Sequence, residues 1–222
     1  MKDNIENNIF KINEDSKIIF DYIEPDVEES KFYIIENFFS NPEDIVEFLS
    51  SMSPSIWKEN SKPSYNTIYF DDMVHDIEAP NIIKPVYDLL GNICNQGTEI
   101  YNIRSNLFKF KNHQFNNYHE HYWSPHKDYG YTGIVYLNEN DDYNGTNIYN
   151  CLDPTYSKIE LEHYEPWIAK EKFELIMTVP PKYNRLFLFN GLKYYHGMNI
   201  FNNRYMGDTE YRMNLVFFFD NV

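Results

Sequence analysis

Apolar and polar residues follow different periods in the two parts of the chain. The segment "SNPEDIVEFLSSM" predicts a helix: Ser40 or Asn41 is a capping residue, Pro42 suits the first turn, and two acidic residues follow at the positive end. The apolar residues after them form a stripe of helical spacing. A second helix is expected over residues 82–95, ended by Gly97, and a strand is expected in "KFYIIENFF" before the first helix.

From Glu99 onward the period changes to two, which indicates strands. Short alternating segments bounded by Asn, Asp, Gly or Pro cover residues 99–112, 131–138, 145–150, 173–180, 184–190 and 211–220. We therefore expect a mainly β fold with supporting helices, built as a double-layered antiparallel sheet or jelly roll. The expected organisation is one domain over 1–222: a flexible start (1–15), a strand and helix support (16–98) and a β core (99–222).

The last predicted strand, "YRMNLVFFFD", carries apolar residues on both faces, so it should be buried on both sides. Arg212 and Asn214 are the polar exceptions on one of these faces. A buried guanidinium stays charged and needs an anion beside it. That anion is either an internal Asp or Glu or the carboxylate of a ligand.

Composition narrows the possible partners. The 222 residues are 42% hydrophobic, enough for a sizeable core, and the 18% aromatic content favours strands. A net charge of −15 argues against nucleic acid or an anionic membrane as the main partner. Cys94 and Cys151 show no motif spacing, and no apolar leader or membrane-length segment is present, so we expect a cytoplasmic protein.

The segment "SPHKDYG" places His126 two residues before Asp128. With 7 His and 34 acidic residues in 222, about one such pair is expected by chance, and a second occurs at His163 and Glu165. His196 follows a predicted strand in "NGLKYYHGMNIF", where a lone histidine is more often structural than a ligand. Two imidazoles and one carboxylate are nevertheless the donor set of a non-haem Fe(II) site, and an inward arginine suits a ligand carboxylate.

Taken in order, the segments "HKD", "GIVYLNENDDYNGTNIY", "YNRLFLFNGLKYYHG" and "YRMNLVFFF" resemble the Fe(II)- and 2-oxoglutarate-dependent dioxygenase superfamily, in particular its prolyl-hydroxylase-like branches. The spacings also agree, with 70 residues between the two histidines and 16 from His196 to Arg212. The segment "FYIIENFFSNPEDIVEFL" resembles the opening strand and support helix of this superfamily. The resemblance covers residues 30–222.

The resemblance implies a double-stranded β-helix in which His126, Asp128 and His196 bind Fe(II). Arg212 would bind the distal carboxylate of 2-oxoglutarate, with Asn214 assisting, and O2 would be the second cosubstrate. The implied reaction is hydroxylation of a C–H bond in a peptide, amino acid or small metabolite. Asp128 occupies the position where halogenating relatives have Gly or Ala, so no halide transfer is expected.

One departure concerns Trp123, which stands where prolyl-hydroxylase-like members often have a tyrosine; Tyr118 or Tyr122 is the expected replacement as a cosubstrate contact. Two other functions stay open: a cupin-type metalloenzyme that uses His119, His121 and His126 without 2-oxoglutarate, and a non-catalytic jelly roll whose tyrosines bind sugars. His163 and Glu165 are expected in an exposed helix or lid, and Arg204 in a solvated loop. The sequence leaves the oligomeric state and the prime substrate undetermined.

Overall fold

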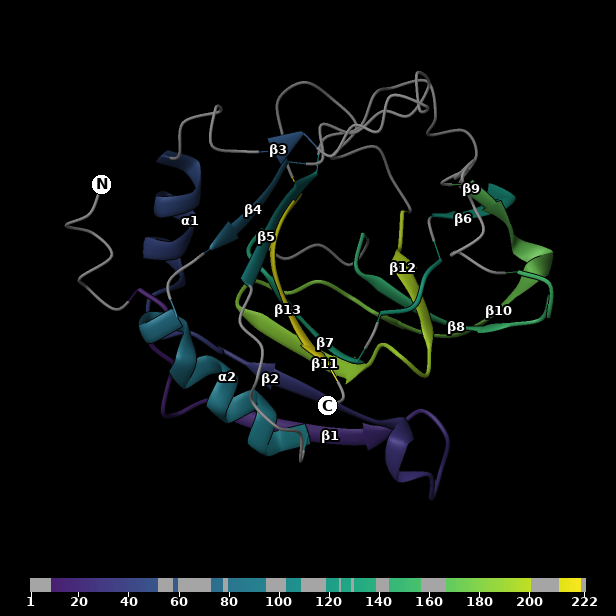
Figure 1. The fold of residues 1–222 in the computed structure, drawn as a ribbon, viewed down its shortest axis with the longest axis horizontal. Helices are drawn as coiled ribbons and strands as arrows, with labels where there is room; N and C mark the ends of the chain where they lie inside the picture. Colours follow the sequence, from purple (N-terminus) through teal and green to yellow (C-terminus); the bar gives the residue numbers. More distant parts are fainter. Residues whose placement is uncertain are drawn as a thin grey trace.

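The structure is a computed structural model that describes residues 9–51, 58–59, 73–77, 80–94, 103–108, 119–123, 125–128, 130–138, 144–156, 167–200 and 212–220. Two helices and four strands form its amino-terminal part (Figure 1): β1 (Lys17–Tyr22), β2 (Lys31–Glu36), α1 (Pro42–Ser51), β3 (Lys58–Glu59), β4 (Met73–Ile77) and α2 (Pro80–Cys94). No helix in the described part of the chain is long and apolar enough to cross a membrane.

The remaining strands alternate with turns rather than helices. They are β5 (Ile103–Phe108), β6 (His121–Trp123), β7 (Gly130–Tyr136), β8 (Thr146–Cys151), β9 (Trp167–Ala169), β10 (Phe173–Val179), β11 (Arg185–Asn190), β12 (Tyr195–Met198) and β13 (Arg212–Asp220). Every segment expected as a strand from its period of two contains one. The strands β6, β9 and β12 were not expected, because each has only three or four residues.

The strands form two main sheets between which the chain passes repeatedly. The large sheet has the order β1-β2-β11-β7-β13-β5-β4-β3, and the small sheet has the order β10-β8-β12. The chain runs from β7 to the small sheet at β8 and β10, returns at β11, crosses again at β12 and returns at β13 (Figure 1). This alternation is the connectivity of a double-stranded β-helix, and it confirms the mainly β fold class.

Each face of the large sheet carries its own core. On the outer face, the helices α1 and α2 cover Val135, Leu186, Leu215 and Phe217. The inner face, toward the small sheet, buries a second cluster that includes Phe187, Val216 and, from β8, Ile148. The strand β13 contributes to both clusters, which confirms that it is buried on both sides.

The first described residues also belong to the outer core. Ile9 and Phe10 are buried, and the backbone N–H of Asn13 donates to the carbonyl of Phe38 at 2.8 Å. Residues 9–13 of the segment expected to be flexible (1–15) are therefore held by packing and hydrogen bonds. Ile9 and Phe10 account for this, because their apolar side chains pack into the outer core.

Candidate metal centre

His126 and His196 are joined through their backbones. The N–H of His126 donates to the carbonyl of His196 at 2.9 Å, and the N–H of His196 donates to the carbonyl of His126 at 2.8 Å. This reciprocal pair adds a residue to the small sheet beside β12 and holds the two imidazole rings with centroids 4.2 Å apart. Residues separated by 70 positions are thus aligned by main-chain bonds that do not depend on their side chains.

The carboxylate of Asp128 is held by its own set of contacts. Its backbone N–H donates to the carbonyl of Gly191 at 2.9 Å, and its Oδ2 accepts a hydrogen bond from Thr132 Oγ1 at 2.5 Å. The same Oδ2 lies 3.2 Å from Nε2 of His196. The carboxylate therefore points toward the two imidazoles.

Together the three side chains form a compact donor set. One ligand atom from each of His126, Asp128 and His196 lies within 4.8 Å of the others, and no other such group of three occurs among the residues that the structure describes. His196 is 3% exposed, and its Nδ1 is buried without a hydrogen-bond partner in that part of the chain. Burial alone would raise the pKa of the Asp128 carboxyl, but the imidazoles of His196 and His126 and the hydroxyl of Thr132 hold that pKa well below its usual range.

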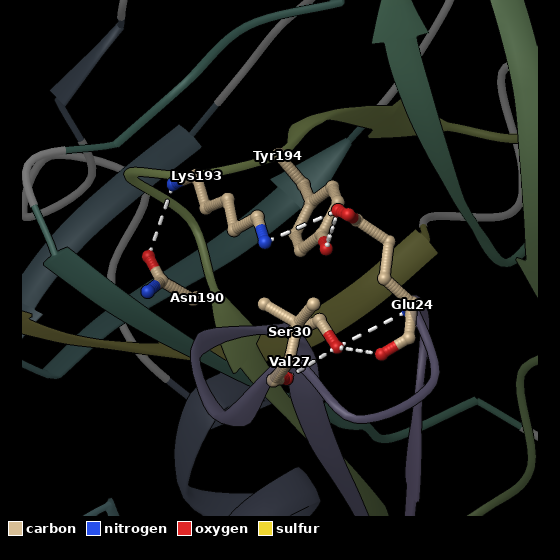
Figure 2. A network of polar contacts seen from close by, with 6 residues as sticks. All are labelled: Glu24, Val27, Ser30, Asn190, Lys193 and Tyr194. Atoms are coloured by element: carbon tan, nitrogen blue, oxygen red, sulfur yellow. Dashed lines mark hydrogen bonds and ion pairs between the residues drawn. The ribbon is translucent and has the colours of Figure 1, made fainter.

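A polar network fixes the turn that precedes β12 (Figure 2). The carboxylate of Glu24 accepts a hydrogen bond from the Tyr194 hydroxyl at 2.6 Å and lies 3.1 Å from Nζ of Lys193. Within the turn, the backbone N–H of Lys193 donates to Oδ1 of Asn190 at 3.0 Å.

Ser30 closes the loop that presents Glu24, since its hydroxyl donates to the carbonyl of either Glu24 or Val27, each at 2.6 Å. The residues of this network flank Gly191, whose carbonyl accepts the hydrogen bond from the Asp128 N–H, and they come shortly before His196 in the chain.

A second polar group lies inside the barrel on β13. Arg212 and Asn214 are 5% and 3% exposed and share the inner face with Val216. Nε of Arg212 donates to the carbonyl of Asn144 at 3.0 Å, and its guanidinium carbon lies 5.7 Å from the centroid of the Tyr136 ring. The alternation of "YRMNLVFFFD" correctly predicted that both side chains point inward.

Tyr136 lies beside Arg212 and Asn214, although it was not among the site residues expected from the sequence. It faces Asn214 across the β7–β13 ladder, and its hydroxyl lies 2.7 Å from Oγ1 of Thr146. Burial raises the pKa of the Tyr136 phenol, although the Arg212 charge opposes this. The signal was available in "GIVYLN", because Tyr136 shares a strand face with the inward Ile134.

Other candidate residues lie elsewhere. Tyr122 packs on Tyr149 with ring centroids 4.6 Å apart, on the face of β8 opposite to the inner-core residue Ile148. Tyr122 therefore lies on the other side of β8 from the inner cluster that Val216 joins, and its contact with a cosubstrate stays a prediction. His119 and His121 are described but are not grouped with the three ligands. Tyr118, His163, Glu165 and Arg204 lie outside the described residues.

Comparison with known proteins identifies the fold. No protein-family profile matches the chain, and no curated protein matches it in sequence. Among solved structures, a prolyl 4-hydroxylase from Phytophthora capsici matches with a TM-score of 0.50 and 13% identity, over 88% of this chain and 60% of that one, so the match spans less than two thirds of that enzyme. A Pseudomonas putida prolyl-4-hydroxylase matches with a TM-score of 0.49 and 11% identity, over 86% of this chain and 92% of that one. A 2OG-Fe(II) oxygenase family protein from Burkholderia pseudomallei gives 0.43 and 11%, over 92% and 84%.

The likeness to the Phytophthora enzyme concerns the arrangement of strands, not the sequence. It agrees with the two sheets and the repeated crossing between them. The chain therefore has the double-stranded β-helix fold that is seen in prolyl 4-hydroxylases.

Proposed function

We propose that this protein is an Fe(II)- and 2-oxoglutarate-dependent oxygenase that hydroxylates a C–H bond in a small molecule or peptide. The observation that carries the proposal is the His126, Asp128 and His196 cluster, whose ligand atoms lie within 4.8 Å of one another. Two imidazoles and one carboxylate are the donor set of non-haem Fe(II) oxygenases, and they leave coordination positions open. The fold likeness is consistent with the proposal but does not carry it.

The chain's own residues fit a divalent metal at this cluster. Asp128 is held as a carboxylate by Thr132 and by its imidazole neighbours, which keeps it anionic and available for a metal. Nε2 of His196 lies 3.2 Å from Oδ2 of Asp128, so the nitrogen and the carboxylate oxygen face the same point, where a divalent metal would bind both. Bound Fe(II) would couple decarboxylation of 2-oxoglutarate to succinate with transfer of one oxygen atom of O2 to the substrate.

The interior of the barrel suits the cosubstrate. Arg212 offers a buried guanidinium, whose fork matches a carboxylate. The hydroxyls of Tyr136 and Thr146 and the amide of Asn214 surround the same space, and the raised pKa of Tyr136 keeps its phenol a neutral donor. We assign the distal carboxylate of 2-oxoglutarate to Arg212, with Tyr136 as the second contact.

Turnover without a prime substrate tests the proposal before any substrate is known. Succinate should form from 2-oxoglutarate only when both Fe(II) and O2 are present, and Asp128→Asn should abolish it. A matched control is Asp153→Asn, which makes the same charge change at a carboxylate that pairs with Lys172 at 3.6 Å, away from the cluster. Equal succinate rates in the wild type and Asp128→Asn would contradict the role of Asp128 as a ligand.

Once a substrate is found, isotope labelling tests the reaction type. With 18-O-labelled O2, the product should carry one labelled oxygen atom, and no chlorinated product should form at any chloride concentration. A product without label from O2 would exclude hydroxylation by this route.

A further inference from the structure

A cavity of about 360 Å³ lies beside the small sheet, and neither Arg212 nor any of the three proposed metal ligands lines it. Residues 121–123, which precede the His126–His196 bridge in the chain, do not pair with β12 but with β9, in the register Tyr122 to Ile168. The cavity fills the space between this β6–β9 pair and the end of β12. It is lined by His119, His121, Tyr122, Trp123, Asn147, Trp167, Lys170, Met198, Asn199 and Ile200.

The polar side of the cavity is basic. Nζ of Lys170 lies 5.2 Å from the centroid of the Tyr122 ring and forms no ion pair with any described residue, although the chain carries 34 acidic and only 19 basic residues. Nδ1 of His121 is buried and lacks a hydrogen-bond partner within the same part of the chain. None of the described residues that line the cavity is acidic. The ammonium of Lys170 is therefore a cation at the cavity that no described carboxylate neutralises, which suits an anionic ligand.

Asn147 does not compete for that ligand. Its Nδ2 donates to the Tyr149 hydroxyl at 2.9 Å and to Oδ1 of Asn199 at 3.3 Å, while its Oδ1 accepts from the Thr178 hydroxyl at 2.6 Å. Its hydrogen-bonding capacity is therefore used within the protein. Lys170 remains as the group that selects for a negative charge on a bound molecule.

Other residues that line the cavity are aromatic or apolar. Trp123 and Trp167 are buried and contact each other edge to face, with centroids 4.8 Å apart, and Ile200 is buried beside them. Such rings favour a flat aromatic ligand through stacking or edge contacts. The volume is near the lower end of the range for small-molecule sites, roughly 300–1,000 Å³, which excludes a macromolecule.

We infer that this cavity binds a small aromatic carboxylate. Its carboxylate would contact Lys170, and its ring would pack against Trp123 and Trp167. Asn147 lines the cavity from the face of β8 opposite to the inner-core residue Ile148, and Arg212 does not line it. Binding at this site requires neither Fe(II) nor 2-oxoglutarate, and so does not depend on the proposed oxygenase function.

Titration calorimetry with 3-phenylpropionate, in the presence of EDTA, tests the inference on the full chain. The acid should bind with a Kd below about 1 mM. The neutral analogue 3-phenylpropanamide should bind at least about tenfold more weakly, because Lys170 then has no charge to neutralise. This comparison uses the wild-type protein and so does not depend on any variant folding.

Three variants identify the site. Lys170→Gln should weaken binding of the acid at least about tenfold, and Lys170→Arg should restore it. Lys172→Gln is the matched control: it removes the same charge from the same 3-10 turn, but Lys172 lies near Asp153 and does not line the cavity. Arg212→Leu should leave binding of the acid unchanged.

Several results would overturn the inference. One is no binding of the acid below about 10 mM, and another is equal affinity for the acid and the amide. An unchanged affinity for 3-phenylpropionate in Lys170→Gln would mean that the acid binds at another site. A loss of its binding in Arg212→Leu would mean that it binds at the proposed cosubstrate site.

Discussion

His126 and His196 hold each other through main-chain hydrogen bonds, so their side chains can be changed without removing the bonds that align the strands. Replacing either residue by Ala should therefore leave the protein folded but unable to retain iron. We expect at least about a tenfold fall in Fe(II) affinity for each variant. Iron content after anaerobic loading and desalting measures the effect, and circular dichroism checks the fold.

The nearby histidines supply the controls. His119→Ala and His121→Ala should retain iron, because neither residue joins the group of three ligands. If His119→Ala instead loses iron while His196→Ala keeps it, the result would favour a cupin-type metal site and contradict the proposed triad.

Arg212 is the residue on which cosubstrate binding should depend. Arg212→Leu removes a buried guanidinium from the inner face of β13 but keeps an apolar side chain there. The Kd for 2-oxoglutarate should rise by about two orders of magnitude or more, since a desolvated, charge-assisted contact of several kcal/mol is lost. Iron should still bind, and equilibrium binding of 2-oxoglutarate under anaerobic conditions measures the change.

Arg185→Leu is the matched control for that experiment. Arg185 lies on β11 and pairs with Glu36 at 2.5 Å, so its loss should affect the β2–β11 seam and not the interior. Unchanged 2-oxoglutarate affinity in Arg212→Leu would make Arg212 a structural residue.

At the scale of elements, the turn between β11 and β12 connects the fold to the metal centre. A Cβ added at Gly191 would lie 2.4 Å from Oγ1 of Thr132 and 3.0 Å from Cβ of Asp128. Gly191→Ala must therefore displace the Thr132–Asp128 contact. We expect Fe(II) affinity to fall by about tenfold or more, as is typical when the groups that orient a metal ligand are disturbed, while thermal unfolding remains cooperative.

Gly133→Ala is a suitable comparison, because its added Cβ would meet Leu186 and Phe217 only at 3.4 and 3.5 Å, on β7 away from the ligands. It should change iron affinity little. Wild-type iron affinity in Gly191→Ala would mean that the turn does not position Asp128.

The elements also show which parts of the fold the sequence could predict. The helix α1 begins at Pro42, as its capping pattern indicated, and β10, β11 and β13 lie within the segments that were predicted as strands. The strand β12 was missed because "YHGM" has no alternation of its own and is defined only by pairing with β8 and His126. Short strands of this kind depend on their neighbours, not on local propensity.

At the scale of the whole molecule, the candidate site depends on contacts that no local pattern encodes. The sequence supplied His126, Asp128, His196 and Arg212 because their order and spacing resemble a known superfamily, whereas a His-x-acid pair alone occurs by chance. The position of Tyr136 opposite Asn214 depends on the β7–β13 register, and the basic cavity depends on β6 leaving β12. Neither the position of Tyr136 nor the cavity can be predicted from the spacing of apolar residues along the sequence.

One site should bind Fe(II) and 2-oxoglutarate together, and anaerobic titration of the protein with both components tests this. Addition of both components should produce a visible metal-to-ligand charge-transfer band that saturates at one equivalent of each. The band should be absent in His196→Ala and should require much more 2-oxoglutarate in Arg212→Leu. Tight iron binding with no such band at saturating 2-oxoglutarate, or an unchanged band in both variants, would contradict the binding of Fe(II) and 2-oxoglutarate at this site.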